Sequence, residues 1–184
     1  MSADVEIDPT DRWRTSVHEA GHAVVGRVLR MVCGPATSLP DHDSAGHHVV
    51  KEHWATLEAW WAREIYRERT SAIHGRIMTY FAGAEAEKEL LDILPTGDGD
   101  DIYQAELMVN FELDIEGEEA ARKLSRLRRQ TRRVVRRHRE LIAEVAKRLT
   151  VCDQVTGEEL DSMVAGPLNL KPVSISRPYS TDSP

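Results

Sequence analysis

The pentapeptide HEAGH, His18 to His22, constrains this chain more than any other segment. It lies within residues 11–32, which predict an amphipathic helix because their apolar residues recur at helical spacing: Trp13, Val17, Val24, Val28 and Val32. Two histidines one turn apart lie on one helix face, where their imidazoles can share a Zn²⁺ ion. Glu19 would then lie beside the ion, in the place of a general base that takes a proton from metal-bound water.

A catalytic zinc ion needs a third protein ligand, and spacing alone does not identify it. The histidine candidates are His42, His47, His48, His53, His74 and His138. The acidic turn TGDGDD, residues 96–101, is a further candidate because it places carboxylates on a glycine-rich turn that opens a helix. Asp98, Asp100 and Asp101 could equally serve only as helix caps, since carboxylates are favoured at helix N-termini.

The rest of the chain predicts a mainly α fold with a small β element. Helical periodicity indicates further helices at 53–68, 71–91, 118–150 and 157–164, and a short one just after the acidic turn. Short strands are expected near 36–39 and at 49–50. The first of these helices contains three tryptophans, Trp54, Trp60 and Trp61, and we expect them at core or interface positions.

Length and composition favour one domain. With 184 residues, the chain is long enough for a single core, which we place at 11–166, between a flexible N-terminal lead (1–10) and a flexible C-terminal tail (167–184). The two cysteines cannot form a disulfide framework and suggest a reducing compartment. No apolar run approaches the length of a membrane span and the acidic first residues do not resemble a signal peptide, so we expect a cytoplasmic protein.

Three segments resemble the peptidase domain of the FtsH family of AAA zinc metalloproteases. They are HEAGHAVV at 18–25, FAGAEAEKEL at 81–90 and TGDGDDIYQAELMV at 96–109. Their order and spacing are more specific than the first motif alone. The resemblance implies a zincin-like helical metallopeptidase domain in which His18, His22 and Asp101 bind Zn²⁺ and Glu19 is the catalytic base.

The sequence departs from this family in several respects. The ATPase module and the transmembrane helices of the family are absent, and Ala84 and Asp100 replace the arginine and asparagine of the family motifs. The resemblance therefore implies a stand-alone zinc endopeptidase that hydrolyses peptides or unfolded chains. A separate ATPase that unfolds substrates is a candidate partner, and a homo-oligomer is compatible with the sequence.

Two other functions remain open. The zinc ion could hold together a binding or regulatory module that has no catalytic activity. Alternatively, the arginine-rich segment 121–140, which holds ten of the 24 lysines and arginines, could bind nucleic acid. The net charge of −7 and the apolar stripe within that segment instead indicate a solvated helix face with ion pairs, which could also bind an acidic partner or another subunit.

Overall fold

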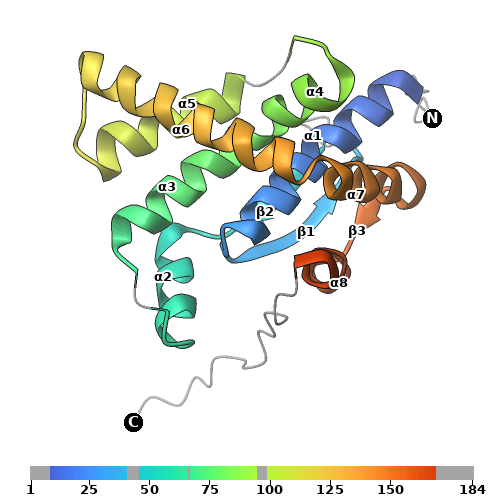
Figure 1. The fold of residues 1–184 in the computed structure, drawn as a ribbon, viewed down its shortest axis with the longest axis horizontal. Helices are drawn as coiled ribbons and strands as arrows, with labels where there is room; N and C mark the ends of the chain where they lie inside the picture. Colours follow the sequence, from blue (N-terminus) through green and yellow to red (C-terminus); the bar gives the residue numbers. More distant parts are fainter. Residues whose placement is uncertain (1–8, 41–45, 66, 95–98, 169–184) are drawn as a thin grey trace, which may run out of the picture.

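The computed structural model describes residues 9–40, 46–65, 67–94 and 99–168. Most of this part of the chain is helical, and a small sheet covers one side, as the sequence predicted (Figure 1). The elements in chain order are α1 (Pro9–Val28), β1 (Cys33–Thr37), β2 (His47–Val50), α2 (His53–Trp61), α3 (Arg69–Tyr80), α4 (Ala82–Leu91), α5 (Gly99–Leu107), the π-helix η1 (Met108–Glu112), α6 (Gly117–Arg137), α7 (Arg139–Cys152), β3 (Gln154–Val155) and α8 (Gly157–Leu168).

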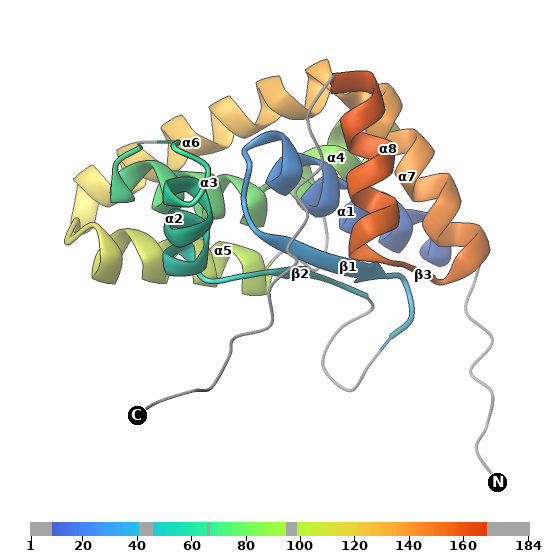
Figure 2. The same ribbon diagram turned by 90° about the horizontal axis from the view of Figure 1, so that it is seen from below.

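Helix α1 lies at the centre of the fold. The sheet packs on one side of it and α7 on the other, and α4 lies along a third side (Figures 1 and 2). The faces of α1 and α7 that meet are aliphatic and fully buried, with Val17 and Val24 in one core cluster with Ile142 and Leu149. Burying these side chains is the main source of stability here, since each contributes on the order of 1.5–3 kcal/mol.

The crossing of α1 and α4 depends on a glycine of the HEAGH motif. A Cβ atom on Gly21 would lie only 2.6 Å from the Ala82 carbonyl oxygen and 2.8 Å from the Ala86 Cβ. Glycine therefore lets the two helices approach more closely than any other residue would. This contact brings α4 to the histidine-bearing part of α1.

The sheet has three short strands in the order β2-β1-β3, and both pairs are antiparallel. Ala36 of β1 pairs with His48 on one side and with Val155 on the other. The two strands predicted after the first helix are confirmed as β1 and β2, with shifted ends. The two-residue strand β3 was not predicted, because it is too short to leave a periodic signal.

The segment 118–150, predicted as one helix, forms two. Helix α6 ends at Arg137 and α7 begins at Arg139, with His138 at φ −111° and ψ 20° between them. The bend lets the two halves of the apolar stripe face different parts of the core: Leu127 packs near α3 and α5, whereas Leu149 packs against α1. The segment 71–91 is likewise divided at Phe81 into α3 and α4.

The tryptophans of the segment 53–68 differ in environment. Trp60 is buried against Leu57 and Ala72, and its indole N–H donates a 2.7 Å hydrogen bond to the Arg30 carbonyl. Trp54 and Trp61 are about half exposed, at 52% and 53%, so neither lies in the core, and an interface position stays a prediction for these two. Helix α2 ends at Trp61, well before residue 68, and Glu64 has a positive φ of 58°.

Both predicted flexible ends lie largely outside the described residues. Helix α1 begins at Pro9, and α8 continues to Leu168, so each helix extends slightly into the segment predicted to be flexible. Among the described helices, none is long and apolar enough to cross a membrane.

Candidate metal centre

Helix α1 presents His18 and His22 on one face, as the motif predicted. Their ring centroids are 4.7 Å apart and the ring planes meet at 71°. This mutual orientation follows from the helix, because residues four positions apart lie one above the other. Glu19 follows His18 on the same turn and is only 5% exposed.

Asp101 completes the cluster from the first turn of α5. Its Oδ2 lies 3.3 Å from His18 Nε2 and 3.2 Å from His22 Nε2. One ligand atom from each of the three residues lies within 4.8 Å of the others. For ligand bonds of about 2.0–2.1 Å at tetrahedral angles, donor atoms are about 3.3 Å apart, which is close to the two distances from Asp101 to the histidines.

Asp100, the other described aspartate of the acidic turn, does not join this group. Asp100 is exposed on the first turn of α5, and Asp98 lies outside the described residues. A carboxylate in a first helical turn is favoured electrostatically wherever it points. Asp101 differs from a simple cap because its carboxylate reaches the histidines of another helix.

The second nitrogen of each histidine is held by a hydrogen-bond acceptor. His22 Nδ1–H donates a 2.7 Å bond to the Thr79 carbonyl oxygen, which can only accept. His18 Nδ1 lies 2.7 Å from Glu87 Oε1, and the other carboxylate oxygen of Glu87 accepts a 2.7 Å bond from Arg14. These partners fix both rings so that Nε2 faces Asp101, the arrangement that orients histidine ligands in metalloproteins.

A glycine on α4 makes room for one of these rings. A Cβ atom on Gly83 would lie 2.4 Å from His18 Nε2 and 2.6 Å from two ring carbons. No other residue fits at this position without displacing the imidazole. Gly46, just before β2, is also tightly surrounded: its Cβ would lie 2.7 Å from the Thr37 carbonyl oxygen and 3.1 Å from Cγ of the catalytic candidate Glu19.

The charges in the cluster stabilise one another. Burial disfavours protonated His18, but hydrogen bonds to Asp101 and Glu87 outweigh it and raise the pKa of His18 to about 10. Burial also lowers the pKa of His22, yet the Asp101 carboxylate raises it above its ordinary value overall. For Asp101, burial is outweighed by the two imidazoles, and its pKa falls well below the usual range. Burial raises the pKa of Glu19, which favours a carboxyl group that readily takes up a proton.

None of the other histidine candidates that the structure describes joins the cluster. His47 is exposed on β2, and its neighbour His48 has a 3.1 Å hydrogen bond from Nδ1–H to the Pro35 carbonyl, while burial holds the pKa of His48 well below its usual range. His53, His74 and His138 are not part of the cluster, and His42 falls outside the described residues. Of the histidines that the structure describes, only His18 and His22 therefore join a metal-binding group.

Sequence reasoning did not assign roles to Glu87, Thr79 or Gly83. Glu87 and Gly83 are within the segment FAGAEAEKEL, which the resemblance singled out, but no pattern there indicates which carboxylate faces His18. Thr79 contributes through its main-chain carbonyl, so its side chain carries no signal of the role.

The fold and the site define a mainly helical protein with a candidate three-residue metal centre. In comparisons with known proteins, no family model matches the chain, and no curated protein is significantly similar to it.

Proposed function

We propose that this chain is a zinc-dependent endopeptidase of zincin-like fold, in which His18, His22 and Asp101 bind Zn²⁺. The main support is the convergence of two Nε2 atoms and one carboxylate oxygen from α1 and α5. Nitrogen and carboxylate ligands suit zinc, and three protein ligands are the number typical of catalytic zinc sites. The acceptors on both Nδ1 atoms further support a metal centre over a chance pair of histidines.

Glu19 is the proposed catalytic residue. When bound, Zn²⁺ would supply a water molecule with a pKa lowered toward roughly 7 and would polarise the scissile carbonyl. The Glu19 carboxylate would accept a proton from the attacking water and return it to the amine of the leaving peptide. Its burial favours this role, because burial raises the pKa of the carboxyl group and so makes the carboxylate a stronger base.

The substrates we propose are peptides and already unfolded chains, cleaved in the cytoplasm. These substrates follow from the resemblance, and folded substrates would require a separate unfolding ATPase as partner. Assembly of several copies of the chain into a homo-oligomer is compatible with this proposal.

A zinc-stabilised binding module is the alternative. Structural zinc sites are typically closed by four protein ligands, whereas the group found in the described residues has three. The buried Glu19 beside it also favours catalysis, since a structural site needs no base.

Substitutions can distinguish the catalytic role of Glu19 from the metal-binding role of Asp101. We expect Glu19→Gln to retain about one zinc ion per chain, measured by elemental analysis, while cleavage of fluorescently labelled unfolded casein falls by about 10²–10⁴-fold. Asp101→Ala should lose most of the zinc. Glu144→Gln on the exposed face of α7 is a matched control and should change neither quantity.

Two results would contradict the proposal. If Glu19→Gln cleaved casein as fast as the unchanged protein, Glu19 would not be the base. If the unchanged, zinc-loaded protein cleaved neither casein nor a broad peptide library, the binding module would be the better explanation.

A further inference from the structure

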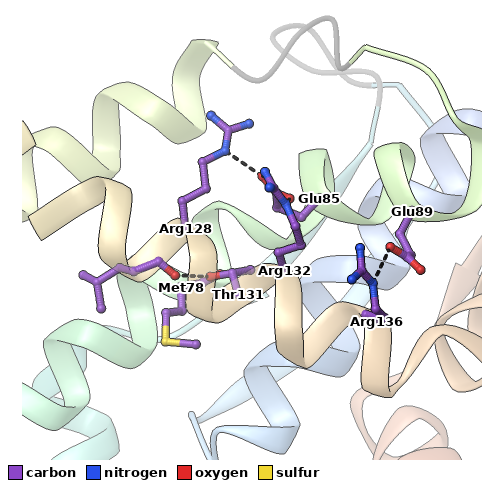
Figure 3. A network of polar contacts seen from close by, with 8 residues as sticks. Met78, Glu85, Glu89, Arg128, Thr131, Arg132 and Arg136 are labelled. Carbon is purple, nitrogen blue, oxygen red and sulfur yellow. Dashed lines mark hydrogen bonds and ion pairs between the residues drawn. The ribbon is translucent and has the colours of Figure 1, made fainter. Parts of the chain in front are cut away.

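Seven of the eight arginines of α6 belong to two sets with different surroundings, and the eighth, Arg122, pairs with Glu118 on the same helix. The first set faces α4: Arg128 and Arg132 each donate a 2.7 Å bond from Nε to Glu85, and Arg136 donates a 3.2 Å bond to Glu89 (Figure 3). These three arginines fasten α6 to α4. Their role is accounted for by helix packing.

The second set, called here the arginine stripe, points away from the core. It consists of Arg126, Arg129, Arg133 and Arg137, all exposed. At 100° per residue these four positions span about 80° of the helix, on the side opposite the buried Leu127, Thr131 and Val135. Within the described parts of the chain, no side chain forms an ion pair or hydrogen bond with any of the four.

The stripe lies on an open surface of the molecule. Helix α6 runs along the outside of the helical layer, on the side away from the sheet (Figures 1 and 2). The four guanidinium groups of the arginine stripe are neighbours, because their residues are three or four positions apart. Like charges at these spacings weaken a helix, so an anionic ligand would relieve their repulsion.

The stripe is short and has acidic residues beyond both ends. From Arg126 to Arg137 the helix rises about 17 Å. Glu118 and Glu119 are exposed on the first turn of α6, and Glu140 and Glu144 are exposed on α7. A long polyanion lying along α6 would meet these carboxylates and a chain whose net charge is −7. A ligand about as long as the stripe would avoid the carboxylates beyond both of its ends.

We propose that the arginine stripe binds a short acidic stretch of another polypeptide. Carboxylates match the planar guanidinium fork in two-point hydrogen bonds, which favours arginine over lysine for this purpose. About five extended residues, or about twelve helical ones, cover the length of the stripe. The acidic residues beyond both ends of the stripe favour such a segment over nucleic acid. The arginine-rich sequence alone had left nucleic-acid binding open.

The test measures binding of a fluorescently labelled oligoglutamate of about twelve residues by anisotropy at low and at physiological salt. The unchanged protein should bind it and lose affinity as salt rises. Replacing all four arginines of the stripe by glutamine should weaken binding about tenfold or more, since each exposed ion pair contributes little and four add up. Glutamine keeps a similar helix propensity, and circular dichroism checks that the helix content is unchanged.

A charge-matched control removes four other exposed cations, at Arg30, Lys51, Arg63 and Lys147, in the same way. This variant should bind oligoglutamate within about twofold of the unchanged protein. Equal loss in both variants would show a general charge effect and overturn the proposal. Tighter binding of duplex DNA of the same total charge than of oligoglutamate would also overturn it, in favour of a nucleic-acid surface. Because the readout is binding, the result does not depend on peptidase activity.

Discussion

Two buried glutamates of α4, Glu85 and Glu87, have the same chemistry and lie two residues apart, but they face opposite sides of the helix. Positions i and i+2 differ by about 200° around a helix axis. Glu87 therefore faces α1, where it contacts His18 and Arg14, whereas Glu85 faces α6, where it binds two arginines. Both are almost fully buried: Glu85 is 1% exposed and Glu87 is 2% exposed.

The difference between them lies in what their partners do. Glu87 holds a ring that presents Nε2 to the proposed metal centre, so its carboxylate acts on the geometry of that site. Glu85 joins two helices through Arg128 and Arg132, so its contribution is to packing and stability. The role of each buried carboxylate on α4 is therefore set by the helix that it faces. Separate variants of the two residues can test whether α4 divides its roles in this way.

The largest effect is expected when Glu85 keeps its charge but loses its partners. Arg128→Gln with Arg132→Gln leaves a carboxylate buried without a counter-charge, and we expect the free energy of unfolding to fall by about 3 kcal/mol. Urea denaturation measures it. Arg126→Gln with Arg129→Gln on the outer face is the matched control and should cost less than about 0.5 kcal/mol. Equal stability of the two double variants would show that the Glu85 pairs do not fasten α6.

The next effect concerns Glu87. Glu87→Gln keeps an acceptor for His18 Nδ1 but removes the negative charge, and we expect zinc affinity to fall about 10–100-fold, measured by competition with a chromogenic chelator. Glu85→Gln is the control, two residues away and facing the other side, and should leave the affinity within about twofold. If both variants lost zinc equally, the proposed division of roles on α4 would be wrong.

From the residues alone, the sequence predicted the geometry within one helix of the candidate site but not which distant groups meet there. His18 and His22 could be placed on one face because four-residue spacing fixes their relation within a single helix. Asp101 came from the resemblance alone, since spacing allowed capping as readily as ligation. The acceptor at Thr79 is a main-chain atom and leaves no trace in the sequence.

The fold shows the same division between local and distant information. A mainly α chain with a small β element followed from periodicity and is confirmed. The bend at His138 did not follow, because the apolar stripe continues on both sides of it while the two halves face different parts of the core. Which helix lies against which is decided by contacts such as Gly21 with Ala82, and these pair positions that spacing along the chain does not relate.

The smallest expected effect is a pH dependence that belongs to Glu85. Burial raises the pKa of this carboxyl group, but hydrogen bonds from Arg132 and Arg128 outweigh burial and hold its pKa below the ordinary 4.5. A carboxyl group with a lowered folded-state pKa adds stability that is complete above the unfolded pKa and is lost as the pH falls through the folded one. The difference in unfolding free energy between the unchanged protein and Glu85→Gln should therefore be constant near neutral pH and shrink below about pH 4.5.

We expect this difference to be about 1 kcal/mol at pH 7, because the two arginines are 33% and 41% exposed and water screens the pairs. Urea titrations of both proteins between pH 3 and pH 7 measure it, and the proposed metal ligands are unchanged in both. Glu89→Gln is the matched comparison, since Glu89 pairs with an arginine that is 67% exposed and should give a smaller difference. A difference that grew as the pH fell would mean that burial prevails over the arginines at Glu85. In that case this carboxylate would destabilise the contact between α4 and α6, and the contrast with Glu87 would have to be explained by packing alone.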